Sequence, residues 1–381
     1  MNKLVLLVIM SLVSISAFAS PSWVHPALNA SNSHWDKATG TLSITKSVSF
    51  GDDSIIDDFY WNIPSQVKTV LIKKNVTLNG HLRFTAEGVI AGEDWNTSII
   101  EGTSTIGWAH GPNAKPEKAT SCKSGPAGDD RVHDCEKWQY GAISVQPRAS
   151  KKSIYTVKNL KILNARTYAI TAINHTLDVD RVKIIHTRGD RDLRSNSDGF
   201  GGGINSRISN SYINTWDDSI KLYRDGMQVE NVTIIHNGNG APFQLGWSNK
   251  KPAKFTLKNV LVKRGTEKHR GGFNLALFSN TRGKVAPTIF ISGLAADYTP
   301  DTKITHQGKN LSIPWVYIRS KSDSKVTLNI EPSSPFYLNL SAQHAGGGKL
   351  SVNGADSAQK GHYVNGSLED VVGCGCTADS I

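Results

Sequence analysis

The middle of the chain alternates apolar and polar residues, and one short pattern returns several times. The unit is apolar, any residue, Asn, apolar, any residue, apolar, as in the run from Val157 to Ile162. Its third position recurs at Asn159, Arg181, Asn210, Asn231, Asn259 and Gly293. The shortest spacings are 21 residues (231 − 210) and 22 residues (181 − 159). A unit of this length with insertions predicts a solenoid, in which each coil buries an apolar stripe against its neighbours.

The repeat predicts strands, because residues 67–84 and the repeat units alternate with a period of two and lack a helical period. We therefore expect an all-β chain folded as a right-handed, pectate-lyase-like parallel β-helix. A β-sandwich is the alternative, since its turns also carry Asn, but its strands rarely repeat one motif at one period. In the β-helix, Asn210, Asn231 and Asn259 would stack at one corner, with Asn159 in the same row.

The ends of the chain differ in composition from this middle part. Residues 1–19 read as a signal peptide: Lys3 is followed by an apolar run and by the small-x-small site Ala17-Phe18-Ala19. We expect a short N-terminal β segment at 20–62, the β-helix at 63–330 and a C-terminal cap or tail at 331–381. No later run reaches the roughly 18 apolar residues of a membrane span. The mature protein is expected to be secreted or periplasmic, without a membrane partner.

Net charge and cysteine content indicate which partners and which cross-links to expect. The net charge is +11, but the basic residues are dispersed, which favours a solvated basic surface over a nucleic-acid site. An even number of cysteines in an exported chain suggests disulfides, with three possible connectivities among Cys122, Cys135, Cys374 and Cys376. Zinc is the weaker interpretation, because the usual ligand spacings are absent. We expect no metal and no cofactor, and the sequence leaves the oligomeric state open.

Three carboxylates share one phase of the repeat. Asp198 precedes Asn210 by 12 residues (210 − 198), and Asp218 precedes Asn231 by 13 (231 − 218), with Asp217 beside it. Equal phase in successive coils means stacking on strands ~4.8 Å apart. We therefore predict that the three acids meet, and that one of them holds its proton more tightly than the others. Such a cluster can divide acid and base work at a glycosidic bond.

The same count predicts a groove across the coils. From Arg181 it reaches Thr167 and Tyr168, next to Arg166, and from Asn259 it reaches Leu245 and Gly246, flanked by Gln244 and Trp247. In the strand after the acidic pair, Lys221 and Tyr223 would face outward beside the acids. The glycines around residues 199–203 are expected to leave the acids uncovered. Taken singly, Ser-Asp-Gly and Asp-Asp are common turn sequences.

These residues resemble a known family. N-S-D-G (196–199), an acidic pair nineteen residues on (217 − 198), D-D-S-I-K-L-Y (217–223) and N-G-A-P-F-Q-L-G-W (239–247) are similar to glycoside hydrolase family 49, the dextranase and isopullulanase family. One Asp followed by an Asp pair is also similar to polygalacturonases, which share the fold, although their G-H-G and R-I-K motifs are absent here. The likeness covers roughly residues 65 to 300.

The resemblance implies an inverting endo-hydrolase of an α-glucan, with dextran as the first choice. By this resemblance Asp217 is the general acid, and Asp198 and Asp218 are the residues that activate water. Sugar would be held by Lys221, Tyr223, Gln244 and Trp247. Two other functions stay open: hydrolysis of another polysaccharide, in particular an acidic one, and non-catalytic carbohydrate binding. A polysaccharide lyase fits less well, since it would need a Lys, Arg or His base.

Overall fold

The structure is a computed structural model that describes much of the chain between residues 22 and 365. The described residues are 22–51, 60–102, 141–165, 168–187, 197–237, 240–246, 252–265, 276–280, 284–297, 303–306, 309–312, 314–318, 324–331, 336–338, 342–346, 349–354 and 363–365. Strands and turns make up these ranges, and none of their segments is a helix suited to crossing a membrane.

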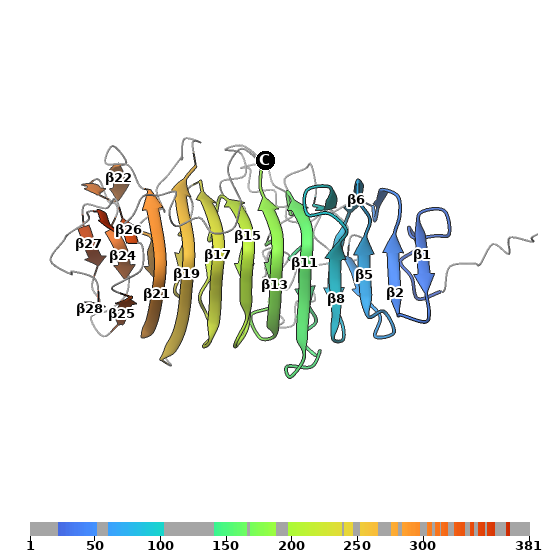
Figure 1. Cartoon of the computed structure of the whole chain (residues 1–381), viewed down its shortest axis with the longest axis horizontal. Helices are drawn as coiled ribbons and strands as arrows, with labels where there is room; N and C mark the ends of the chain where they lie inside the picture. Colours follow the sequence, from blue (N-terminus) through green and yellow to red (C-terminus); the bar gives the residue numbers. More distant parts are fainter. Residues whose placement is uncertain are drawn as a thin grey trace, which may run out of the picture.

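Seventeen strands of the described part form the larger of two sheets (Figure 1). Nearly all pair in parallel with the strand one coil away; the pairs β1–β2 and β26–β29 are antiparallel. The strands are β1 (Ser33–Asp36), β2 (Thr41–Ile44), β3 (Val48–Ser49), β5 (Thr69–Ile72), β6 (Val76–Asn79), β8 (Gly88–Gly92), β9 (Ser98–Glu101), β11 (Ile154–Leu163), β13 (Thr176–Ile185), β15 (Arg207–Thr215), β17 (Met227–His236), β19 (Ala253–Arg264), β21 (Pro287–Asp297), β25 (Lys325–Ile330), β26 (Phe336–Leu338), β28 (Lys349–Asn353) and β29 (Tyr363–Asn365).

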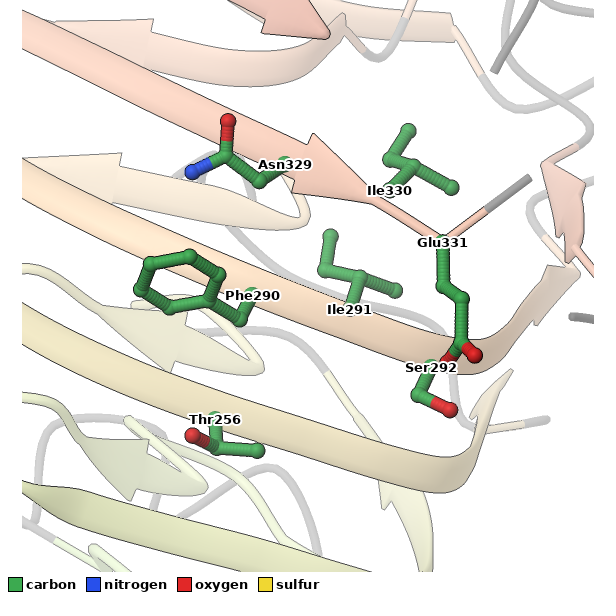
Figure 2. A pocket seen from close by; sticks show the side chains of 7 residues that line it. All are labelled: Thr256, Phe290, Ile291, Ser292, Asn329, Ile330 and Glu331. Atoms are coloured by element: carbon green, nitrogen blue, oxygen red, sulfur yellow. The ribbon is translucent and has the colours of Figure 1, made fainter. Parts of the chain in front are cut away.

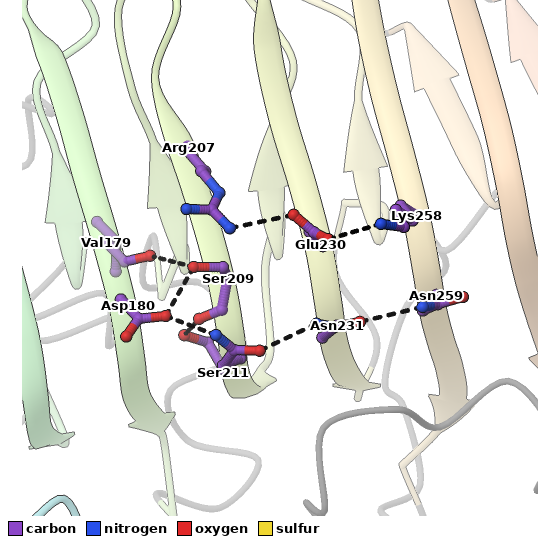
Figure 3. A network of polar contacts seen from close by, with 10 residues as sticks. Val179, Asp180, Arg207, Ser209, Ser211, Glu230, Asn231, Lys258 and Asn259 are labelled. Atoms are coloured by element: carbon purple, nitrogen blue, oxygen red, sulfur yellow. Dashed lines mark hydrogen bonds and ion pairs between the residues drawn. The ribbon is translucent and has the colours of Figure 1, made fainter.

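The long strands from β11 to β21 bend at the third position of the repeat. Its non-glycine residues take a left-handed backbone with φ between 48° and 56°, and Gly293 has φ 87°. Asn231 donates a hydrogen bond to Asn210 at 3.0 Å, and Asn259 donates one to Asn231 at 3.2 Å (Figure 3). The predicted stack of these three side chains is confirmed. Asn tolerates this conformation better than most residues, which explains its recurrence at the corner.

The second sheet closes each coil. Its ten described strands are β4 (Tyr60–Ile63), β7 (His81–Phe84), β10 (Ile143–Val145), β12 (Ile170–Thr171), β14 (Phe200–Gly201), β16 (Ile220–Lys221), β18 (Phe243–Gln244), β20 (Phe278–Asn280), β24 (Pro314–Ile318) and β27 (Ala342–Gly346). Two further strands of the described part, β22 (Lys303–His306) and β23 (Lys309–Ser312), pair only with each other and form a small antiparallel hairpin. The architecture is the predicted parallel β-helix.

Stacked apolar rows fill the space between the two sheets. Phe200, Ile220, Phe243 and Phe278 pair in register along the second sheet and are fully buried. The rings of Phe243 and Phe278 lie 5.0 Å apart and stack. Burying each such side chain contributes about 1.5–3 kcal/mol, so the row fixes the register of this sheet. Register matters here because the acids lie directly before these strands.

Parallel pairing extends beyond the range expected for the β-helix at both ends. β2 pairs with β5 and β4 pairs with β7 in parallel, so coils begin before residue 63. β25 pairs with β28 in parallel, so they continue past residue 330. These terminal coils lack the Asn corner by which the repeat was recognised, and their strands carry only the alternation of buried and exposed positions.

Candidate active site

Asp198, Asp217 and Asp218 lie in the turns that lead into the second sheet. Asp198 comes two residues before β14, and the acidic pair lies between β15 and β16. The register pairs Phe200 with Ile220, which sets Asp198 against Asp218 (200 − 2 and 220 − 2). The backbone amide of Gly199 accordingly donates to the carbonyl of Asp218 at 3.0 Å. Neighbouring coils thus bring the acids together as the repeat predicts.

The three carboxylates form one tight cluster. One oxygen from each can be chosen so that all three lie within 4.8 Å of one another. All three side chains are buried, with exposed fractions of 1% for Asp198, 7% for Asp217 and 4% for Asp218. Asp217 Oδ1 accepts a hydrogen bond from the Asp218 amide at 2.8 Å, and Asp218 Oδ1 accepts one from the Ala241 amide at 3.0 Å. The turn therefore holds both carboxylates in fixed positions.

Lys221 supplies positive charge at the centre of the cluster. Its ammonium group forms ion pairs with Asp198 and, at 2.9 Å, with Asp218 Oδ2. It also lies 5.4 Å from the ring centre of Tyr168 and 5.5 Å from that of Tyr223. Burial alone would lower the pKa of Lys221, but the adjacent carboxylates of Asp198 and Asp218 reverse this and raise the pKa well above its usual value. Lys221 is therefore charged throughout the ordinary pH range.

Asp198 holds its proton more tightly than an ordinary aspartate. Burial raises its pKa well above 3.8; Lys221 opposes this shift, and the charges of Asp217 and Asp218 add to it. Burial also raises the pKa of the Tyr168 and Tyr223 hydroxyls, which stay protonated and can donate hydrogen bonds. The predicted proton-holding carboxyl is thus Asp198 in the free protein.

Two glycines let the coils approach closely enough for this cluster. A Cβ atom on Gly199 would lie 2.3 Å from the Ser219 carbonyl oxygen. A Cβ on Gly240 would lie 2.3 Å from Asp218 Oδ1 and 2.5 Å from Asp217 Oδ1, and Gly240 has φ +71°. The expectation that glycines leave the acids uncovered is wrong, because the acids are buried and the glycines serve close packing.

The structure places the remaining predicted residues as follows. Tyr168 lies beside Asp198, since the next amide, that of Ala169, donates to the Asp198 carbonyl at 2.8 Å. Gln244 pairs in register with Lys221 and accepts a hydrogen bond from the Tyr223 hydroxyl. The position level with the acids is Ala241, where the count from Asn259 had predicted Leu245 and Gly246.

Several predicted residues lie outside the described part of the chain. They are Arg166, Trp247, the four cysteines Cys122, Cys135, Cys374 and Cys376, and the signal peptide at 1–19. Their predicted roles stay predictions.

A buried polar network behind the acids was not predicted. Ser219 Oγ lies 2.8 Å from Thr215 Oγ1 and 3.0 Å from His236 Nδ1, and all three residues are fully buried. The Thr215 hydroxyl also donates to the Asp217 carbonyl at 3.2 Å. This network fixes the turn that carries Asp217 and Asp218. Each of its members occupies an ordinary strand or turn position, so the sequence carries no local signal for it.

The acids have the donor set and spacing of a cation site. Three carboxylate oxygens within 4.8 Å suit a hard cation such as Ca²⁺ or Mg²⁺, which prefers oxygen ligands. The ammonium of Lys221 pairs with two of these carboxylates. The chain itself therefore supplies one positive charge at this position.

Comparison with known proteins agrees with this architecture. No family model and no curated protein matches the sequence. Nine chains of solved structures match, among them Dex49A from Penicillium minioluteum, with a TM-score of 0.51 over 76% of this chain. The fold is that of Dex49A. The identity to Dex49A is 14%, and the match spans 49% of its length, so the likeness shows the fold alone.

Proposed function

We propose that this chain is a glycoside hydrolase that cleaves a polysaccharide at the cluster of Asp198, Asp217 and Asp218. The observation that carries the proposal is the convergence of three buried carboxylates within 4.8 Å around one ammonium group. Hydrolysis of a glycosidic bond needs a proton donor for the leaving oxygen and a carboxylate that activates water or attacks the sugar. The fold of Dex49A supports the same reaction class.

We propose Asp217 as the general acid and Asp198 and Asp218 as the residues that activate water. Lys221 pairs with Asp198 and Asp218, which favours their ionised form, as a base requires. The raised pKa of Asp198 weighs against this assignment, because a carboxyl that keeps its proton is suited to be the acid. The two assignments make different predictions for a substrate with a good leaving group.

The test replaces each aspartate by Asn, which keeps the size of the side chain and removes the ionisable group. Each variant is expected to lose about 10²–10⁴-fold in kcat/KM. The unfolding midpoint of the Asp217 variant should stay close to that of the parent, whereas the Asp198 and Asp218 variants each lose a pair with Lys221 and should be less stable. An aryl glycoside with a good leaving group should rescue the Asp217 variant, since its departure needs no proton. Rescue of the Asp198 variant instead would move the acid role to Asp198. Three variants with parental rates would refute the site.

We propose a neutral α-glucan as substrate, with dextran and its α-1,6 linkages first. The family resemblance supports this choice, and the aromatic rings of Tyr168 and Tyr223 beside the acids offer faces on which a sugar can stack. The net charge of +11 favours the alternative, an acidic polysaccharide. Reducing-sugar release from dextran, pullulan, starch and polygalacturonate separates the two. No release from any polymer would favour the non-catalytic binding function.

Two features of the proposal depend on the sequence alone. We propose inversion at the anomeric carbon, from the family resemblance, and export of the mature chain after residue 19, from the N-terminal signal pattern. Inverting pairs of carboxyl groups are typically about 6.5–9.5 Å apart and retaining pairs about 5–5.5 Å apart. The nearest oxygens of the three acids lie within 4.8 Å of one another, which is a shorter measure than the separation between carboxyl groups, so inversion is proposed from the resemblance. The configuration of the product decides between inversion and retention.

A further inference from the structure

The outer face of the larger sheet carries a regular row of side chains near its C-terminal end. Thr256 on β19 pairs with Phe290 on β21, Phe290 pairs with Asn329 on β25, and Asn329 pairs with Asn353 on β28. In parallel strands such partners stand side by side on the same face. The row therefore crosses four coils on the outside of the solenoid.

Phe290 is the solvent-exposed aromatic residue of this row. Its side chain is 41% exposed, and beside it is a hollow of about 260 Å³ (Figure 2). A single exposed aromatic residue is common on protein surfaces and needs no function. What distinguishes Phe290 is the hollow next to its ring and the polar groups around it: Thr256, Ser292, Asn329 and Glu331 line the same hollow.

These groups match the chemistry of a sugar. The exposed ring offers an apolar face, on which the C–H face of a pyranose can lie. Asn353 Nδ2 donates to Asn329 Oδ1 at 2.8 Å, which orients the Asn329 amide. Amide and hydroxyl groups are donors and acceptors, and so are sugar hydroxyls. The hollow is smaller than the about 300–1,000 Å³ of typical small-molecule pockets, so it suits one ring of a chain lying on the surface.

We propose that this face is a second carbohydrate-binding site, which holds a neutral polysaccharide chain with one sugar ring stacked on Phe290. The inference rests on the proposed function, since it assumes that the chain acts on a polysaccharide. The hollow lies on the part of β21 that precedes the corner at Gly293, whereas the acids lie in the turns before β14 and β16. A polymer bound here would be held on the protein without being cut.

Charge favours a neutral chain over an acidic one. Among the described residues that line the hollow, Glu331 is the charged one, and its carboxylate would repel a uronate. Lys325 and Lys349 oppose each other four residues before Asn329 and Asn353 and would attract an acidic polymer. Because the lysines lie outside the hollow and Glu331 lines it, we assign the stacked ring to a neutral sugar.

Native gel electrophoresis with polymer cast into the gel tests the site without hydrolysis, using the Asp217→Asn variant as parent. We expect dextran or pullulan to retard the parent, and Phe290→Ala to weaken this retention by about 2- to 12-fold, the factor that corresponds to about 0.5–1.5 kcal/mol for an aromatic contact. Phe290→Tyr should keep it. Asn329→Ala, across the hollow, should weaken it independently.

The matched control is Ile154→Ala, which removes another exposed apolar side chain (53% exposed) from the same face far along the solenoid. The polymer in the gel should retard this variant as much as it retards the parent. Unfolding midpoints of all variants check that the fold is intact. On the active protein, Phe290→Ala should raise KM for the polymer and leave kcat/KM for a short oligosaccharide unchanged, because a short chain reaches only the acids.

The outcomes separate this site from the proposed reaction. Loss of retention in Phe290→Ala together with no hydrolysis of any polymer would refute the reaction and support the site. Hydrolysis by the native protein together with equal retention of parent, Phe290→Ala and Ile154→Ala would refute the site and leave the reaction. If only polygalacturonate retards the protein, and this retention depends on Phe290, the assignment to a neutral chain would be overturned. The same conclusion would follow if no neutral polymer retards the parent.

Discussion

Replacing Lys221 by Met is the sharpest test of the electrostatics of the cluster. The change keeps the length of the side chain and removes the ammonium that pairs with Asp198 and Asp218. At 2.9 Å and an effective dielectric constant of about 20, one such pair has a Coulomb energy of about 6 kcal/mol. Desolvation offsets part of this, and breaking a buried pair typically costs about 3–5 kcal/mol. We expect a loss of that size at pH 7.

The loss should depend on pH, with a sign that follows from the carboxylates. Without Lys221, which opposes the shift, the pKa of Asp198 rises further above that of the unfolded chain. A carboxyl with a raised folded pKa stabilises the fold below its unfolded pKa, and this contribution is lost as pH rises through the folded pKa. The free energy of unfolding of the variant should therefore be lowered most at neutral pH and least in acid. In a plot of kcat/KM against pH, the fall on the acid side should also occur at a higher pH in the variant than in the native protein.

Urea unfolding at pH 7 and in acid, near the ordinary aspartate pKa of 3.8, measures this difference, provided that the slope is unchanged. Lys258→Met is the matched control, because Lys258 pairs with Glu230 at 3.0 Å but is 52% exposed. An exposed pair contributes about 0.2–1 kcal/mol, so the control should lose little at either pH. A Lys221→Met loss equal to that of the control, or equal at both pH values, would show that the pairs of Lys221 with Asp198 and Asp218 do not stabilise the fold.

Three further predictions follow from single features of the structure. Gly240→Ala should lower kcat/KM by more than it lowers the unfolding midpoint, since its Cβ would meet Asp217 and Asp218; Gly51→Ala, at a positive φ with nothing within 4 Å, controls for backbone strain. Asn231→Ala should cost about 1–2 kcal/mol more than Asn231→Gly in urea unfolding, because both break the ladder and only Ala strains the left-handed corner. NMR of the first anomer formed should show inversion, and retention would overturn that part of the proposal.

The fold could be predicted because one position of the repeat is under a backbone constraint. The corner residue adopts a left-handed conformation, and this restricts it to Asn, Gly or, once, Arg181. Asp180, next to Arg181, accepts the hydrogen bond of Asn210 at 2.7 Å, which continues the ladder where the Asn is missing. The part that Asp180 plays in the ladder becomes visible in the sequence only once the register is known. Terminal coils without the Asn corner were correspondingly assigned too short a range.

The position of the acids could be predicted, but not that of the groove beyond them. Asp198 and Asp218 precede their corner residues by 12 and 13 residues, so the count from the corner works. Ala241, which lies level with them, precedes Asn259 by 18 (259 − 241), five more than the 13 of Asp218. Three of the five additional residues lie between β18 and β19 and two at the start of β19, and no periodicity restricts the length of this connection. Counting across such a connection shifted the prediction toward Gly246.

The cost of the cluster is itself an argument about function. Three carboxylates and one ammonium are buried at a position where the coil needs none of them, since the stacked apolar rows and the Asn corner already fix its register. Burying charge is unfavourable unless each group is paired, and Asp198 keeps a raised pKa even beside Lys221. A surface that only binds sugar gains nothing from buried charges that repel one another. Violations of the ordinary rules of burial are expected at sites of chemistry, which supports the proposed reaction at Asp198, Asp217 and Asp218.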